Sequence, residues 1–417
     1  MTSSVTSAML KSFYFIVFMA LVFLISNPIP ISIAIAVLSL VSIAFLFSTN
    51  NTPIQLDRYG KLFVVVLSAY LVSKIAPFVS SGFIARYLSP GFHMLVSLPI
   101  FLVLWKLSRD TDGEKPLINI ITIAAALGSF GGLAVAYYQT QVLGMGRADG
   151  FLFSINFGFL AGTLFAISLG LVGKNRLSVL SFLSCVAALG SIMLSGSRGA
   201  LFPLLFVLIA WLLFSFKHLP KRYLVVILVL AIATPYFAYK TSPFVKARLD
   251  TGLTELKQVA EGDVFRSGSL IARVQLWIAA THAYEQSPVF GLTYPEREQL
   301  NKTLVDTGEV VPWVGTVRRG HAHSQYFETL ATGGLVGMFC LAVYLFAPMV
   351  IHLRFLVTNS TNVYARTGFL FTLSVAGFGL TEVLLQQEMI ATYYAFMQTI
   401  FFVFAYRQWQ GDKTESQ

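Results

Sequence analysis

The chain has 417 residues, of which 56% are hydrophobic, 14% aromatic and only 12% charged. Soluble domains carry about 25% charged residues, so this composition and a mean hydropathy of +0.73 exclude a soluble globular enzyme. The formal net charge of +10 arises from basic residues between apolar blocks and does not indicate binding to nucleic acid. A bilayer-spanning helix needs about 20 mainly apolar residues, and such blocks recur from residue 12 to residue 406. The sequence predicts an all-α polytopic protein embedded in the lipid bilayer.

The apolar blocks predict about twelve transmembrane helices. The first block follows Lys11 and lacks a small-x-small cleavage site, so we interpret it as a retained helix and not as a signal peptide. The spans are expected at residues 12–27, 30–48, 62–80, 91–107, 117–137, 151–173, 177–195, 200–216, 222–240, 326–351, 367–386 and 389–406. The predicted domains are therefore the first nine helices within 1–240, a polar loop domain with amphipathic helices at 241–325, the last three helices within 326–406, and a tail at 407–417.

The basic residues of the short connections predict the orientation, because Lys and Arg resist translocation. Of the 29 basic residues, 15 lie in connections on the side of the N-terminus, four lie near the opposite ends of spans, and ten lie in residues 240–325. This distribution predicts that both termini are cytoplasmic and that the long loop lies on the opposite, outer side of the membrane.

Four basic residues do not follow the cytoplasmic bias of the short connections. They are Lys74, Arg86, Arg147 and Arg198, each near the outer end of a different span. Any one of them can be explained by a side chain that reaches the interface, because a charge at depth is costly. Four together, with few carboxylates nearby, indicate a site for an anionic group carried by a lipid. Phosphate is the obvious candidate because guanidinium groups bind its oxygens bidentately.

Arg198 and Arg147 both lie among small residues, in Leu194-Ser-Gly-Ser-Arg198-Gly-Ala200 and Gly144-Met-Gly-Arg147-Ala-Asp-Gly150. Small residues break a helix and let backbone N–H groups approach a ligand, and the next helix presents its positive N-terminal end. The alternatives are a tight turn with an exposed arginine at Arg198, and a local pairing of Arg147 with Asp149.

Two helices are expected within the long loop. Residues 245–260 place apolar side chains at helical spacing with charges among them, which indicates a helix on the membrane surface. A second helix is expected from Ser269 to the Ser287-Pro288 stop. On it, Arg273 and Trp277 share one face, an arrangement suited to a sugar or phosphate site. An ordinary solvent-facing arginine beside a buried tryptophan is the alternative.

The loop closes with His321-Ala-His323-Ser324, where Ser324 can cap the next helix. The positive helix end disfavours the imidazolium of His323, which favours a neutral imidazole able to act as general base. Metal chelation by the two histidines and two ordinary interfacial histidines are the alternatives; a third ligand at a recognisable spacing is missing. The two cysteines lie far apart in apolar blocks, so we expect no disulfide, thiolate metal site or cofactor.

Three motifs in order resemble the O-antigen ligase and O-antigen polymerase superfamily. They are Ser-Gly-Ser-Arg198-Gly-Ala, the Arg273…Trp277 helix followed by Ser287-Pro-Val-Phe-Gly291, and His323-Ser-x-x-Phe327 with Gly334. Phe327 stands where the family usually has Leu. The ligase pattern Arg-x-x-x-Leu is matched literally by Arg266-Ser-Gly-Ser-Leu270, but the helix around Arg273 favours that arginine, with Arg266 as its rival.

The resemblance implies a GT-C-like glycosyltransferase at the periplasmic face of the bacterial inner membrane. The donor would be a polysaccharide on undecaprenyl diphosphate, and the acceptor a sugar hydroxyl of the lipid A core. Arg198 and Arg273 would bind the diphosphate, and His323 would be the base. Further substrate-binding residues are expected to be Lys74, Arg86, Arg147, Arg266, Trp277 and His321.

The expected chemistry is a single, metal-independent displacement with inversion, because arginines can hold a departing diphosphate and the histidine can activate the hydroxyl. An O-antigen polymerase and a protein O-oligosaccharyltransferase are the alternatives within this chemistry. A transporter of lipid-linked sugar is the non-enzyme alternative; it is disfavoured because the sequence shows no obvious internal repeat and its exceptional charges gather at the outer ends of spans.

Overall fold

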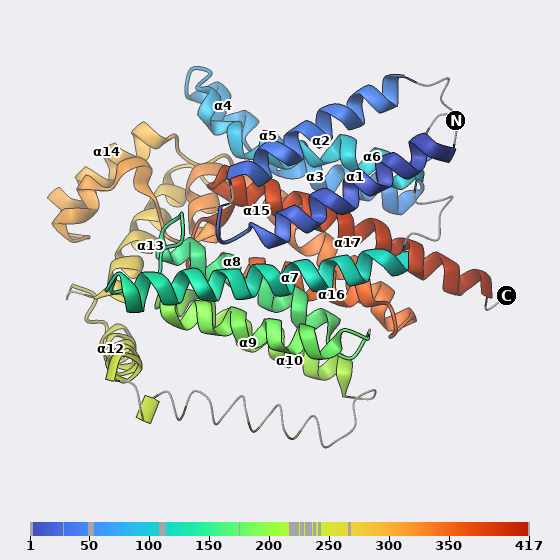
Figure 1. The fold of residues 1–417 in the computed structure, drawn as a ribbon. Coiled ribbons are helices and arrows are strands. Elements are labelled where there is room, and N and C mark those ends of the chain that lie inside the picture. The colour runs from blue at the N-terminus through green and yellow to red at the C-terminus, as the bar shows by residue number, and fades with distance from the viewer. Residues whose placement is uncertain are drawn as a thin grey trace. The chain divides into compact units, whose positions relative to one another are not determined.

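The computed structural model describes residues 3–27, 29–48, 54–107, 114–174, 176–216, 239–240, 243–265 and 268–415, and residues 225, 229 and 236 singly. Every regular element in these ranges is helical (Figure 1). The α-helices are α1 (Ser3–Val22), α2 (Ile29–Phe47), α3 (Arg58–Ser73), α4 (Ile75–Ser80), α5 (Ser89–Leu95), α6 (Ser97–Leu107), α7 (Glu114–Tyr137), α8 (Ser154–Leu171), α9 (Ser178–Ser195), α10 (Arg198–Ser215), α12 (Pro243–Ala260), α13 (Ser269–Gln286), α14 (Tyr294–Asp306), α15 (Gln325–Thr358), α16 (Val363–Phe378) and α17 (Glu388–Glu415). Shorter turns of 3-10 or π type are η1 (Ala85–Tyr87), η3 (Tyr138–Val142), η4 (Pro312–Thr316), η5 (Arg318–Gly320) and η6 (Leu384–Gln386).

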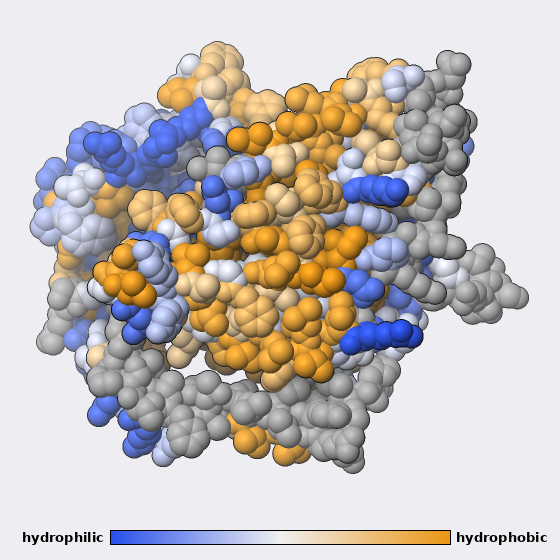
Figure 2. All heavy atoms as spheres, in the orientation of Figure 1, coloured by the Kyte–Doolittle hydropathy of each residue, from blue (hydrophilic) through white to orange (hydrophobic). Residues whose placement is uncertain are grey.

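The helices confirm the predicted fold class. In the described part of the chain, nine helices are long and apolar enough to cross a membrane, and Ser7–Val22 and Val363–Phe378 are two shorter apolar helices. Each of these eleven overlaps one of the predicted spans. The twelfth span, at 222–240, lies mostly outside the described residues. Large apolar side chains remain exposed, such as Leu40 at 66% and Leu213 at 72%. Figure 2 shows hydrophobic side chains spread over the visible helices, as expected for surfaces that face lipid.

The chain forms two compact units: Met1–Trp211 with Phe339–Gln417, and Leu212–Met338. In the first unit, small residues allow close helix packing, as is usual between helices in membranes. A Cβ added at Gly128 of α7 would lie 2.1 Å from the carbonyl oxygen of Leu21, and one at Gly162 of α8 would lie 2.5 Å from the ring of Phe378. Bulkier residues at these positions would force the helices apart.

Helix α16 is attached to the C-terminal end of α8 by Arg366. Its Nε and Nη2 each donate to a carbonyl oxygen at 2.7 Å, those of Gly170 and Val172. Gly170 lies in the last turn of α8 and Val172 is its C-cap residue. Carbonyls at the end of a helix lack helical partners and favour a cation. The span predicted at 367–386 is wrong at its far end, because α16 stops at Phe378. The following turn carries buried apolar residues, so hydropathy alone could not separate it from a helix.

The second unit packs α13 and α14 around a small apolar core that includes Leu276, Leu300 and Val314. Helix α13 begins at Ser269 and ends at Gln286, as predicted from the serine-proline stop. The carboxylate of Glu255 on α12 accepts the amide of Leu270 at 2.8 Å and thereby caps α13. The helix predicted at 245–260 is confirmed as α12, and its position on a membrane surface stays a prediction, as does the division of the chain into domains. Helix α14 is not among the helices predicted from the sequence.

Candidate functional site

The turn before Arg198 has the predicted broken-helix geometry. Helix α9 ends at Ser195, Gly196 adopts a left-handed φ of 63°, and Arg198 is the first residue of α10. Gly158 of α8 lies against this turn, where an added Cβ would be 2.6 Å from the Cβ of Ser197. Arg198 is therefore half-buried at the positive end of a helix, a setting that suits an anionic ligand.

The loop that carries Arg147 is attached to this same turn. Arg147 donates from Nε to the carbonyl oxygen of Ser195 at 2.8 Å, and the amide of Ala148 donates to Leu194 at 3.0 Å. The side chain of Gln139 binds both the amide and the carbonyl of Gly150, at 2.9 and 3.0 Å. Of the predicted outer cations, the structure thus joins Arg147 to the turn of Arg198, through a backbone carbonyl that the sequence did not indicate.

Lys74 and Arg86 have different surroundings. The helix expected at 62–80 is interrupted at Lys74, between α3 and α4. Pro77 has no N–H for the carbonyl of Ser73, which explains the break. Lys74 is only 4% exposed, with Nζ 5.1 Å from the ring centroid of Tyr70, so it does not extend to the surface. Arg86 is exposed on η1.

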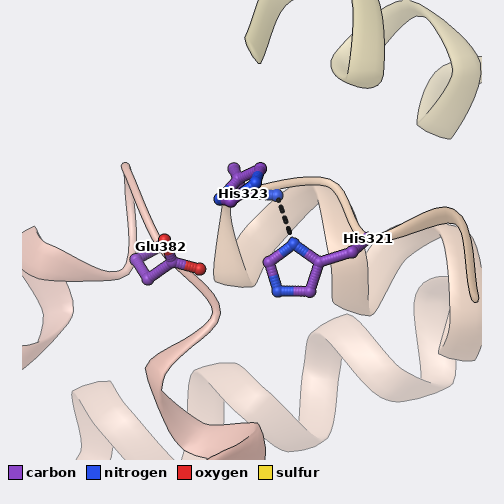
Figure 3. Close-up of side chains that lie close together, drawn as sticks. All are labelled: His321, His323 and Glu382. Atoms are coloured by element: carbon purple, nitrogen blue, oxygen red, sulfur yellow. Dashed lines mark hydrogen bonds between the residues drawn. The ribbon is translucent and has the colours of Figure 1, made fainter. Parts of the chain in front are cut away.

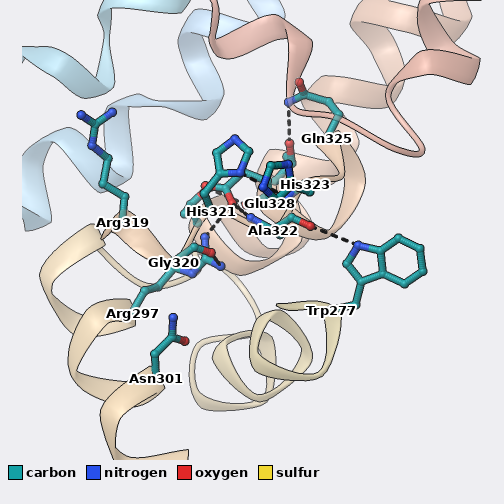
Figure 4. Close-up of polar contacts among 12 residues, drawn as sticks. Trp277, Arg297, Asn301, Arg319, Gly320, His321, Ala322, His323, Gln325 and Glu328 are labelled. Atoms are coloured by element: carbon teal, nitrogen blue, oxygen red, sulfur yellow. Dashed lines mark hydrogen bonds and ion pairs between the residues drawn. The ribbon is translucent and has the colours of Figure 1, made fainter. Parts of the chain in front are cut away.

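In the second unit, Ala322 anchors the segment that carries the two histidines. It is fully buried in the apolar core, whereas His321 and His323 on either side are half-buried. Its amide donates to Oε2 of Glu328 at 3.0 Å, and its carbonyl accepts the indole N–H of Trp277 at 3.1 Å (Figure 4). The backbone between the two histidines is therefore held from both directions.

A buried ion pair supports this segment. Nη1 of Arg297 lies 2.9 Å from Oε2 of Glu328, and each side chain is 1% exposed. Nη2 of Arg297 also donates to the carbonyl of Gly320. Gly320 has a left-handed φ of 63°, and a Cβ there would lie 2.9 Å from Nε of Arg297. Arg297 is not predicted from the sequence, because nothing local distinguishes it from the other charged residues of the loop.

The two histidines contact each other directly (Figure 3). The amide of His323 donates to Nδ1 of His321 at 3.3 Å, and the ring centroids are 4.5 Å apart. This bond requires an unprotonated Nδ1 on His321. Both imidazoles are potential metal ligands, although Nδ1 of His321 is already engaged. His323 has a φ of 46°, which is rare for a residue with a side chain and typical of functional positions. Ser324 directly precedes α15, as predicted.

The face of α13 predicted to carry Arg273 and Trp277 is present. Nη1 of Arg273 lies 3.4 Å from the carbonyl of Ser269. The indole of Trp277 stacks on Phe327, with centroids 5.0 Å apart and planes at 7°. Phe327, at the position where the resemblance implies Leu, thus packs against this indole. The indole N–H of Trp277 also donates to the carbonyl of Ala322 and so supports the histidine segment. Its contact with substrate stays a prediction. Arg266, the rival arginine, lies outside the described residues.

The remaining motif residues meet at a break in α15. Gly334 has φ 56° and ψ −152°, and the amides beyond it leave the helix to donate to the 287–291 segment. Leu335 donates to the carbonyl of Pro288 at 2.8 Å, and Leu292 donates in return to Ala331 at 2.8 Å. A Cβ at Gly334 would lie 2.4 Å from the backbone of Val289, and a Cβ at Gly291 would lie 2.4 Å from the backbone of Gly333. Both glycines are thus required by close backbone contact.

The fold and these residues define a polytopic, all-helical membrane protein with a half-buried histidine on a firmly held backbone. Residues 183–342 match the family model for O-antigen ligase. This match confirms, over that segment, the resemblance to the O-antigen ligase and polymerase superfamily. An uncharacterized protein of Haemophilus influenzae is 26% identical over 234 residues, which cover 54% of this chain. The chain matches 58% of the length of that relative.

Proposed function

We propose that this protein is an O-antigen ligase, which transfers a polysaccharide from undecaprenyl diphosphate to a sugar hydroxyl of the lipid A core at the periplasmic face of the inner membrane. The observation that carries the proposal is His323, half-buried at φ 46° and held by its neighbours within the segment that matches the ligase family. A strained, supported imidazole is the arrangement expected of a general base.

In the proposed reaction, His323 accepts the proton of the acceptor hydroxyl. The acceptor oxygen forms a bond to the anomeric carbon of the donor sugar, and the bond from that carbon to the diphosphate breaks, with inversion. Arg198 and Arg273 stabilise the leaving diphosphate, because guanidinium groups bind phosphate oxygens and offset the negative charge that develops on them. Such arginines supply the positive charge that a metal would otherwise provide, so the reaction is expected to be metal-independent.

Purified protein in detergent, given lipid-linked polysaccharide and lipid A core without nucleotide, tests the proposal. We expect product to form in the presence of EDTA. Substitution of His323, Arg198 or Arg273 by Ala should abolish transfer while the protein still inserts. His282→Ala is the matched control, since this histidine of the same unit pairs with Glu285 and Glu309 at 3.1 Å on its two ring nitrogens. If His323→Ala keeps wild-type turnover, His323 is not the general base.

Deletion of the gene in its host separates the ligase from its relatives. Long polymer stranded on the lipid carrier, with bare core on lipopolysaccharide, supports the ligase. Core capped with one repeat unit supports a polymerase instead, and loss of glycan from exported proteins supports a protein O-oligosaccharyltransferase. Movement of lipid-linked sugar without a new covalent bond would contradict all three.

A further inference from the structure

Two charged side chains hold two backbone groups next to the histidines. Oε2 of Glu328 accepts both Nη1 of Arg297 at 2.9 Å and the amide of Ala322 at 3.0 Å. The other arm of the guanidinium binds the carbonyl of Gly320. Gly320 and Ala322 flank His321, so the ion pair binds the backbone on both sides of that residue. Ala322 also directly precedes His323.

Thermodynamic stability alone does not explain this pair. Both side chains are 1% exposed, and removing two charges from water costs about as much as their attraction returns. Apolar residues of similar volume often stabilise a fold equally well. What apolar residues cannot do is accept the amide of Ala322 and donate to the carbonyl of Gly320. The distinctive contribution of the pair is therefore the geometry of residues 320–323.

His323 needs such a constraint because its backbone is in a disfavoured region. At φ 46° the residue would relax to an ordinary conformation if its neighbours allowed it. Relaxation would turn the imidazole away from its present direction. A general base must lie within hydrogen-bond reach of its proton, and a displacement of about 1 Å can cost roughly 100-fold in rate.

We propose that Arg297 and Glu328 are positioning residues that hold His323 in its reactive direction through Gly320 and Ala322. This inference rests on the proposed function, in which His323 is the base. Neither residue touches the substrate in this proposal. The pair acts on the rate of the chemical step and not on the binding of donor or acceptor.

The test measures turnover, KM for the lipid-linked donor, thermal unfolding, and hydrogen exchange of the peptide that contains the Ala322 amide, all on the full chain in detergent. The variants are Glu328→Gln, Arg297→Lys, and the double variant Arg297→Met with Glu328→Leu, which removes both charges and keeps an apolar filling. Glu296→Gln is the matched control. Glu296 neighbours Arg297 on α14, and its carboxylate accepts the amide of Thr293 at 2.8 Å within the helix cap.

We expect each of the three variants to lower kcat by roughly 10- to 100-fold, with KM unchanged within about twofold. The double variant should keep its melting temperature while the Ala322 amide exchanges faster. The control should keep wild-type kcat and exchange. Wild-type kcat in the double variant, or unchanged exchange, overturns the inference. His323→Ala distinguishes the two proposals: if it retains turnover, His323 is not the base of the proposed function, whereas the exchange data still report whether the pair holds the segment.

Discussion

The indole nitrogen of Trp277 donates a hydrogen bond to the carbonyl oxygen of Ala322 at 3.1 Å, across 45 residues of sequence. The same indole stacks on Phe327, which lies in the first turn of α15, after the two histidines. One side chain of α13 therefore supports both the histidine segment and the start of α15. This contact links the tryptophan to the candidate base without placing it on the substrate.

Trp277→Phe should separate the two contacts of this side chain. The phenyl ring can still stack on Phe327, but the buried carbonyl of Ala322 loses its donor, which costs about 1–3 kcal/mol. We expect turnover to fall by roughly tenfold, because the segment that carries His323 loses one of the contacts that fix its position. The measurement is kcat in the reconstituted transfer assay. Phe327→Leu, which keeps an apolar contact, should stay within about threefold of wild type; a loss as large as that of Trp277→Phe would contradict this explanation.

Gly334→Ala should disrupt the break in α15. Its φ of 56° with ψ −152° is accessible almost only to glycine, and the new Cβ would lie 2.4 Å from the backbone of Val289. Neither Val289 nor the helix can move away easily, so we expect a loss of more than about 3 kcal/mol. The measurement is the fraction of protein that elutes as a monodisperse peak, together with its melting temperature.

Gly333→Ala is the matched control for that substitution. The nearest atom to a Cβ at Gly333 is the Cγ2 of Thr329 at 4.0 Å, an ordinary contact. The adjacent glycine should therefore accept alanine with little change in melting temperature. Equal damage from both substitutions would show that the contact with Val289 is not the cause.

Arg147→Met should loosen the loop that precedes the turn of Arg198. Methionine keeps much of the apolar stem but cannot donate to Ser195, and a charge-assisted hydrogen bond contributes about 1.5–3 kcal/mol. We expect a lower melting temperature for Arg147→Met. Arg86→Met, at an exposed position of η1, should leave the melting temperature unchanged. Equal melting temperatures for Arg147→Met and wild type would mean that the bond to Ser195 does not stabilise this loop.

Lys174 should make stability depend on pH. This residue lies in the connection between α8 and α9, where burial and then the charge of Arg366 lower the pKa of its ammonium from 10.5 to about 8. The unfolded chain therefore binds more protons than the folded chain between pH 8 and 10.5, so the free energy of unfolding rises with pH across that window. The contribution is limited because the group is partly solvated.

Lys174→Met should remove this rise. We expect the gain in free energy of unfolding of the variant over the wild type to be largest below pH 8 and to become smaller towards pH 10.5. The variant also loses the bond from Nζ to the carbonyl of Ser360 at 3.2 Å, which shifts its curve by a constant amount. Melting temperatures across this pH range provide the measurement, and parallel curves would contradict the assignment.

Much of the fold was predictable because its signals are local. The hydrocarbon thickness of a bilayer sets the length of an apolar helix, so the spans could be located from hydropathy. The start of α13 at Ser269 and its end before Pro288, and the turn at Gly196, follow from the backbone preferences of serine, proline and glycine. Arg198, Arg273, Trp277 and the two histidines were singled out in the same way.

Tertiary structure alone decided how these residues are supported. Arg297 and Glu328 are separated by 31 residues, and neither the charge nor the spacing of either residue identifies its partner. The buried turn after Phe378 and the burial of Lys74 were hidden for a related reason, since apolar composition does not record backbone shape. Backbone conformation and hydropathy depend on short stretches of sequence, whereas the pairing of distant side chains depends on how the helices pack.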